Sequence, residues 1–230
     1  NSWAPALDDL GQIWGQGALE VLNPTDLGAN YFSGVLYSLP DQKDTSRNSG
    51  FSMRKDIVDE LGITVPEVGT WDDMHEILVQ VHEAHPDMYP VVSTWAGGGY
   101  QETLPIDPLD DSLGVLENII ESDSTEVVSL HATDSYREYC ERMYQWNQEG
   151  LIMPDITTST ENNLLAGNGF AMIENWKPGK EYENYKSTGK EVVFMKLHED
   201  NIKYTGCANG NSFIIPWSSE NPEKAMMLWD

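Results

Sequence analysis

Short apolar runs alternate along the chain with segments in which apolar residues recur every three or four positions. The runs predict buried strands, and the recurring pattern predicts amphipathic helices, because a helix turns once in about 3.6 residues. The helical pattern is clearest where Trp71, Met74, Leu78 and Val81 share one face. The expected strands are residues 34–40, 51–54, 89–94, 127–130, 170–174, 191–197 and 212–216.

Capping residues indicate where the helices begin and end. Thr70 and Asp73 form a capping box, and Gly62 is a typical helix stop. The expected helices are residues 5–22, 55–62, 70–85, 134–150, 159–169 and 221–230, and the polar stretch 41–50 is an expected loop. Strands separated by helices predict an α/β fold with a largely parallel sheet.

The two cysteines do not form a metal or redox motif. Cys140 falls mid-helix, at a position that we interpret as a buried thiol, and Cys207 is far away in sequence. A disulfide between them and two free thiols both remain open.

Composition limits the classes of partner. The 230 residues are 40% hydrophobic, enough for one large domain or two lobes with cores. A formal charge of −25 repels phosphates and anionic membranes, which argues against binding of nucleic acid or lipid surfaces. Such acidity fits a secreted or surface-exposed protein, but acidic cytosolic proteins exist too.

We interpret the chain as an excised piece of a longer protein. Asn1 is not a start methionine, and the last expected helix stops after about two turns. No apolar run approaches the roughly 20 residues that cross a bilayer. A missing export signal is therefore uninformative.

Familiar catalytic and metal motifs do not occur. His75, His82 and His85 share one expected helix, but His75 and His82 lie two turns apart, so we expect solvated or core-edge histidines and no metal. Residues 107–114 lack the offsets of a calcium loop, and the glycines at 97–99 lack those of a phosphate loop. We expect no cofactor.

Aromatic and amide residues gather in loops after strands. Tyr37 ends one strand, Trp95 and Tyr100 follow another, and Asn175 and Trp176 follow a third. In open α/β sheets, ligands bind beyond the carboxyl ends of the strands. An aromatic face beside polar groups suits a sugar, whose C–H face and hydroxyls need both. The alternative is that the tryptophans only cap the core.

The order of motifs resembles bacterial extracellular solute-binding proteins of family 1, the lipoproteins that deliver mostly sugars and oligosaccharides to ABC importers. The resemblance spans about Tyr37 to Trp229. The motifs that carry it are YSLPDQKD, GFSMRKDIVDELGI, TWDDMHEILVQVHEAHPDMYPVV, YQWNQEGLIMPD, GNGFAMIENWKPGKE and IIPWSSENPEKAMMLW.

The resemblance implies a periplasmic-binding-protein-like (type II) fold of two α/β lobes that close on a ligand. Residues 36–200 would form mostly the second lobe. Residues 1–35 and 201–230 would belong to the first lobe or the hinge. The rest of both lobes would lie in the missing flanking parts.

The resemblance also implies a site and partners. Trp176 would stack on a sugar in an aromatic-lined interlobe cleft, residues 95–100 would line that cleft, and Asp41 and Gln42 would add polar contacts. The partners would be a sugar or oligosaccharide and the membrane permease of an ABC importer. We expect a monomeric, non-enzymatic, cell-surface lipoprotein.

Two other classes stay open. A glycoside-active enzyme predicts a close carboxylate pair with one raised pKa. A non-catalytic surface domain predicts no cleft and a buried Trp176.

Overall fold

The computed structural model describes residues 7–41, 46–92, 103–109, 113–119, 124–156, 167–199, 202–203 and 212–230. The chain divides into two units. Unit 1 consists of residues 1–45 and 205–230, and unit 2 consists of residues 46–204. The chain therefore leaves unit 1, builds unit 2 and returns. Which lobe each unit represents stays a prediction.

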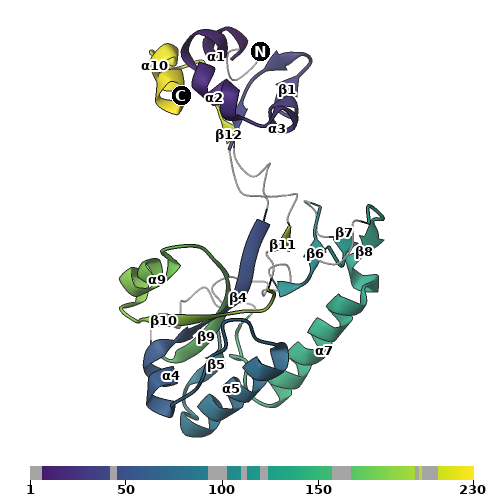
Figure 1. Ribbon diagram of the computed structural model, residues 1–230, viewed down its shortest axis with the longest axis vertical. Coiled ribbons are helices and arrows are strands. Elements are labelled where there is room, and N and C mark those ends of the chain that lie inside the picture. Colours follow the sequence, from purple (N-terminus) through teal and green to yellow (C-terminus); the bar gives the residue numbers. More distant parts are fainter. Residues whose placement is uncertain are drawn as a thin grey trace. The chain divides into compact units, whose positions relative to one another are not determined.

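Unit 1 combines short helices with two small antiparallel sheets (Figure 1). Its elements are α1 (Asp8–Trp14), α2 (Gln16–Val21), α3 (Pro24–Gly28), β1 (Tyr31–Phe32), β2 (Val35–Leu36), β3 (Leu39–Pro40), β12 (Ser212–Phe213) and α10 (Pro222–Trp229). Strand β1 pairs with β2, and β3 pairs with β12. Its core consists of Leu7, Ala18, Leu22, Leu36, Leu39, Ile215 and Met226.

The single helix expected over residues 5–22 is instead two helices, α1 and α2, which meet at Gly15. A Cβ at Gly15 would lie 2.7 Å from the Met226 sulfur. Glycine therefore lets α10 pack closely against this junction, and that tertiary contact coincides with the break.

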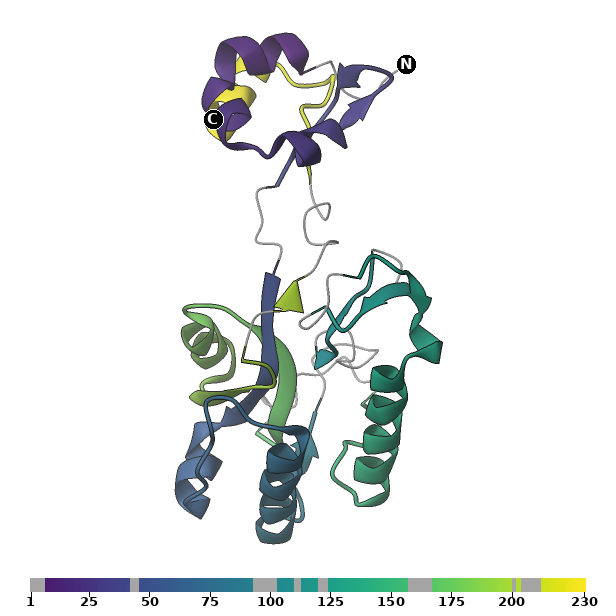
Figure 2. The same cartoon turned by 45° about the vertical axis from the view of Figure 1, so that its right-hand side comes forward.

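Unit 2 is built on a twisted sheet with helices on both sides (Figures 1 and 2). Its strands are β4 (Ser46–Arg54), β5 (Tyr89–Val91), β6 (Ile106–Asp107), β7 (Gly114–Glu117), β8 (Val128–Ser129), β9 (Gly169–Trp176), β10 (Val192–Lys196) and β11 (Ile202–Lys203). Its helices are α4 (Lys55–Leu61), α5 (Trp71–Ala84), η1 (Leu130–Ala132), α7 (Asp134–Gln148) and α9 (Lys180–Thr188). None of the helices in the described part of the chain is long and apolar enough to cross a membrane.

The expectation of a largely parallel sheet is wrong at the level of strand pairing. The strand order is β10-β4-β9-β5, and β4 is antiparallel to both of its neighbours. Strand β5 is parallel to β9. Because β4 separates them, β9 and β10 still run in the same direction, so their carboxyl ends lie at one edge of the sheet.

The polar stretch expected to be a loop contributes the first half of β4, since residues 46–50 pair with neighbouring strands. Two buried serines in β4 have polar partners: the Ser49 hydroxyl donates to Asn175 Oδ1 at 2.8 Å, and the Ser52 hydroxyl donates to Glu174. A polar strand can be buried here because its side chains are hydrogen-bonded across to β9.

Helix α5 follows the sequence pattern closely. Thr70 and Asp73 form the expected capping box, and the buried residues are Met74, Ile77, Leu78 and Val81. Gly62 ends α4 in the left-handed conformation, with φ of 65°. These predictions are confirmed.

The core of unit 2 contains a cluster of large aromatic side chains. Trp146 of α7 lies 5.7 Å from Trp71 and 6.2 Å from Phe51, measured between ring centroids. Trp71 also contacts Phe51 edge-on at 5.6 Å. Contacts between α5, α7 and β4 therefore run through aromatic rings.

Cys140 is exposed and free, so its assignment as a buried thiol is wrong. Trp146 is the buried residue of α7, and Met143 is half-buried. The face of α7 that packs on the core therefore leaves position 140 facing solvent. Cys207 lies outside the described residues.

Asp56 is held by two cations. Arg54 donates to it at 2.6 and 2.9 Å, and Lys190 lies 3.2 Å away. The Arg54 side chain is only 6% exposed and also donates to the Gly167 carbonyl at 2.6 Å. The hydrogen bonds from Arg54, followed by the contact with Lys190, hold the pKa of Asp56 well below its usual range.

We expect Asp56→Asn to lower the free energy of unfolding by about 1–2 kcal/mol at pH 7, since solvent screens the half-exposed carboxylate. A lowered pKa in the folded state means that this stabilisation is complete above the unfolded pKa of about 4 and is lost as the pH falls below it. Urea denaturation at pH 7 and pH 3 measures the difference, which should shrink at pH 3. An equal difference at both values would contradict the ionic explanation.

Candidate functional site

Trp176 is the last residue of β9 and is half-buried. Its ring stacks on Phe194 of β10, with 4.4 Å between centroids and an interplanar angle of 11°. In the register of the sheet, Trp176 pairs with Asn48 and Phe194 pairs with Ser52, so Gly50 of the intervening strand lies between them. A Cβ at Gly50 would collide with the backbone of Met195 and Lys196, so glycine here lets β10 lie close to β4. One face of the indole is covered, and its orientation is fixed.

The side chains of Asn175 and Trp176 lie on opposite faces of the sheet. Successive side chains of a strand point to opposite sides of a sheet. Asn175 is exposed and accepts the hydrogen bond from Ser49. The structure therefore separates two residues that adjacency in sequence had placed together.

A buried carboxylate lies two residues before Trp176. Glu174 accepts hydrogen bonds from Ser52 and, at 2.7 Å, from Asn184 of α9, and Lys180 lies 3.1 Å away. This network ties α9 to the end of β9. This network was not predicted from the sequence, although a glutamate that closes an apolar run is the kind of signal that could have revealed it.

The other predicted site residues lie elsewhere or outside the described residues. Tyr37 and Asp41 are half-buried and belong to unit 1, next to β3. Trp95, Tyr100 and Gln42 lie outside the described residues. That these residues form one site with Trp176 stays a prediction.

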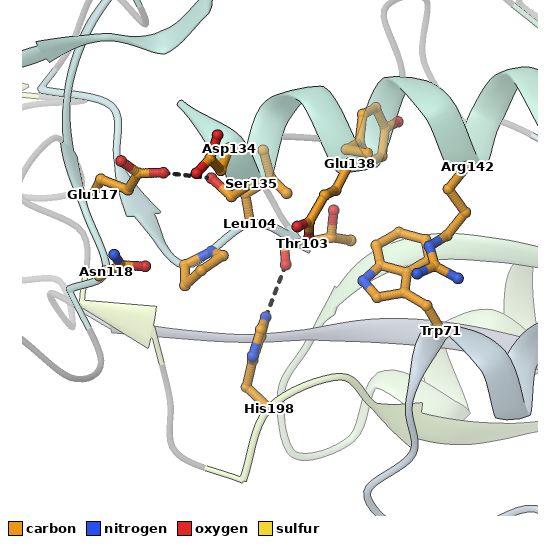
Figure 3. Close-up of a pocket in the computed structure, with 12 residues that line it drawn as sticks. Trp71, Thr103, Leu104, Glu117, Asn118, Asp134, Ser135, Glu138, Arg142 and His198 are labelled. Carbon is orange, nitrogen blue, oxygen red and sulfur yellow. Dashed lines mark hydrogen bonds between the residues drawn. The ribbon is translucent and has the colours of Figure 1, made fainter. Parts of the chain in front are cut away.

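Unit 2 contains a pocket of about 360 Å³ that the sequence analysis did not predict (Figure 3). Helix α7 contributes Asp134, Ser135, Glu138, Tyr139 and Arg142. The remaining lining comes from Trp71 at the start of α5, residues 103–105, Glu117 and Asn118 at the end of β7, and His198 after β10.

The α7 residues reach the pocket because of their spacing. Ser135, Glu138, Tyr139 and Arg142 follow the i, i+3, i+4, i+7 pattern of one helical face. Thr133 fixes the start of the helix by accepting a hydrogen bond from the Tyr136 amide at 3.3 Å. This polar stripe beside the apolar one was the signal in the sequence.

Several polar groups in the pocket have fixed orientations. Arg142 donates to Asp72 at 2.8 Å, and its guanidinium carbon lies 5.6 Å from the centroid of the Trp71 ring. His198 Nε2 donates to the Thr103 carbonyl at 2.8 Å (Figure 3). Because that nitrogen carries the proton, Nδ1 is the acceptor of a neutral His198 ring.

Carboxylates dominate the charge of the pocket. Glu117 accepts a hydrogen bond from Ser135 at 3.2 Å, Asp134 is paired with Arg137, and Glu138 is exposed. Since Asp72 balances Arg142, the lining carries an excess of negative charge. The described residues contain no group of three or more histidine, cysteine or acidic side chains that could hold a metal ion.

Comparison with known proteins finds no matching family model. A curated relative from Streptococcus pneumoniae serotype 4, named carbohydrate ABC transporter substrate-binding protein, is 23% identical over 238 residues. That match covers 99% of this chain and 47% of the relative.

Two solved structures from the same species have a similar fold. The N-glycan transport solute-binding protein NgtS is 21% identical, with a TM-score of 0.78 over 98% of this chain and 50% of its own. The substrate-binding protein FusA, in complex with kestose, is 16% identical, with a TM-score of 0.61 over 97% of this chain and 50% of its own.

These matches confirm the resemblance to ABC-importer solute-binding proteins and the α/β, periplasmic-binding-protein-like fold. The chain spans about half the length of the relatives that it matches.

Proposed function

We propose that this protein is the extracellular solute-binding component of an ABC importer and that it binds a sugar or oligosaccharide. The observation that carries the proposal is the match to a carbohydrate substrate-binding relative over 99% of the chain. Similar folds with bound ligands support the choice of solute, since one NgtS structure holds Man1GlcNAc and FusA holds kestose. The membrane permease is the proposed protein partner, and we propose a monomeric lipoprotein.

The proposed protein binds its solute without catalysis. A glycoside-active enzyme would use a carboxyl group with a raised pKa. The support for binding without catalysis is the name of the curated relative, carbohydrate ABC transporter substrate-binding protein. The alternative of a surface domain required a buried Trp176, whereas this residue is half-buried.

Trp176 is the proposed stacking residue. Phe194 holds its ring by stacking at 4.4 Å, so little side-chain freedom is left to lose when a sugar binds. The uncovered part of the indole offers an apolar surface at the carboxyl edge of the sheet. Contributions from Asn175, Trp95, Tyr100, Tyr37, Asp41 and Gln42 stay predictions.

The test is sugar binding by the full-length protein. A thermal-shift screen with neutral oligosaccharides, including kestose and mannose-containing N-glycan fragments, should raise the melting temperature for at least one of them. With that sugar, Trp176→Ala should weaken binding by about 1–3 kcal/mol in calorimetry, as measured for bases stacked on aromatic side chains. Trp176→Phe keeps an aromatic ring and should lose less binding free energy than Trp176→Ala.

Either of two results would argue against this role. The Trp176→Ala variant could bind with unchanged affinity while melting much earlier, as expected of a tryptophan that only packs. Alternatively, peptides or amino acids could raise the melting temperature while no sugar does.

A further inference from the structure

His198, which lines the pocket of Figure 3, lies at the same edge of the sheet as Trp176, whereas Trp71 of that pocket packs on Phe51, on the face of the sheet opposite Trp176. Strands β9 and β10 run in the same direction, Trp176 ends β9, and His198 follows β10 by two residues. The amide of Leu197 donates to the carbonyl of Ser49, which keeps this segment beside the start of β4. In open α/β sheets, this edge is where ligands bind.

The size of the pocket suits one or two sugar rings. About 360 Å³ falls at the small end of the range of ligand pockets and far exceeds the space that a single metal ion needs. Leu104, Pro105 and the rings of Trp71 and Tyr139 supply apolar surface for the C–H groups of a sugar.

The polar groups suit hydroxyls. Glu117 and Glu138 are acceptors when ionised, and each can accept several O–H donors. Asn118 and Ser135 both donate and accept, and in a neutral His198 ring Nδ1 is an acceptor because Nε2 donates to Thr103. A sugar ring presents hydroxyls that donate and accept in just this mixed fashion. In Figure 3, the Glu138 carboxylate points from α7 toward Thr103 and Leu104, across the pocket.

Charge decides which sugars fit. Among the described lining residues, Asp134 is paired with Arg137 and Arg142 with Asp72, which leaves Glu117 and Glu138 as the carboxylates without a lysine or arginine partner. The chain as a whole carries −25. A carboxylate or phosphate placed here would meet like charges at short range and would lose its hydration, and the described lining residues offer no unpaired lysine or arginine in return.

We infer that this pocket, formed by α5, α7 and the end of β7, binds a neutral or amino-bearing sugar unit through Glu117 and Glu138 and rejects uronates and phosphosugars. This inference rests on the proposed function, because it presumes that the solute is a carbohydrate. It adds a subsite separate from Trp176 and a rule of selectivity by charge.

The experiment uses the full-length protein and calorimetry. The tightest neutral oligosaccharide from the screen is compared with its analogue in which one hexose is the matching uronate, and with the matching hexosamine. The uronate should bind at least about tenfold more weakly than the neutral sugar. The hexosamine should bind at least as tightly as the neutral sugar.

The variants are Glu138→Gln and Glu117→Gln, with Glu141→Gln as the matched control. Glu141 lies on the same helix as Glu138, is exposed and does not line the pocket. Each pocket variant should weaken binding of the neutral sugar about tenfold, since a hydrogen bond to a charged group is lost. The double variant should reduce the difference in affinity between the neutral sugar and the uronate. The Glu141→Gln control should leave both affinities unchanged. Glu138 is exposed, so its variant should keep the melting temperature of the unliganded protein.

Each contrary result has a distinct meaning. If both pocket variants bind like the unaltered protein while Trp176→Ala weakens binding, the pocket inference is wrong and the proposed function stands. If the uronate binds as tightly as the neutral sugar, the charge rule is wrong. If no probe binds the unaltered protein, the proposed function and this inference fail together.

Discussion

Replacing Trp146 with alanine should lower the free energy of unfolding by about 3–5 kcal/mol, the range for a large aromatic side chain lost from a core. The side chain is 1% exposed, contacts the rings of Phe51 and Trp71, and stacks on His75 at 6.2 Å between ring centroids. It is also the buried residue of α7. Its loss removes the main apolar contact that fixes this helix.

Urea denaturation followed by circular dichroism measures the effect. Tyr144→Ala is the control, because Tyr144 lies two residues away on the same helix and is 69% exposed. It should change stability little. Since α7 supplies Glu138 and Arg142 to the pocket, Trp146→Ala should also weaken the binding of any ligand held there. A loss below about 1 kcal/mol would mean that α7 is held by other contacts.

Leu78→Ala should cost about 2–5 kcal/mol, as other buried leucine truncations do. Leu78 is 0% exposed and lies in the buried stripe of α5 with Met74, Ile77 and Val81. Truncation leaves a cavity in a close-packed core, because the surrounding strands relax only in part.

The same denaturation experiment serves for this variant. Glu76→Ala on the exposed side of α5 is the matched control, and alanine favours the helix there. If Leu78→Ala and Glu76→Ala prove equally mild, the assignment of the buried face of α5 is wrong.

Local signals in the sequence determined α5 almost completely. A capping box, an apolar stripe and Pro86, which follows the helix, all act within a few residues, so no distant contact was needed to interpret them. The same holds for the glycine that ends α4 and for the position of Trp176 at the end of an apolar strand. The order of such segments was also enough for the resemblance to solute-binding proteins, which the comparisons confirm.

Tertiary contacts decided what polarity alone could not. Residues 46–50 are polar and resemble a loop, yet they form a strand because they pair with β11 and β9 and because Asn175 of β9 accepts a hydrogen bond from the Ser49 side chain. The direction of β4 between β9 and β10 depends on pairing between residues more than 100 positions apart. The pattern of a strand carries no information about the direction of its neighbours, so the alternation of strands and helices predicts a largely parallel sheet that the pairing of β4 contradicts.

The candidate site likewise depends partly on local sequence and partly on tertiary contacts. The sequence marked Trp176 because its neighbours are polar, but only the structure supplied Phe194 as the ring beneath it and Glu174 as the anchor of α9. The pocket beside α7 draws on segments from Trp71 to His198, which are adjacent only after folding. Spacing along a chain determines which residues share a helix face, whereas the packing of elements determines what that face meets.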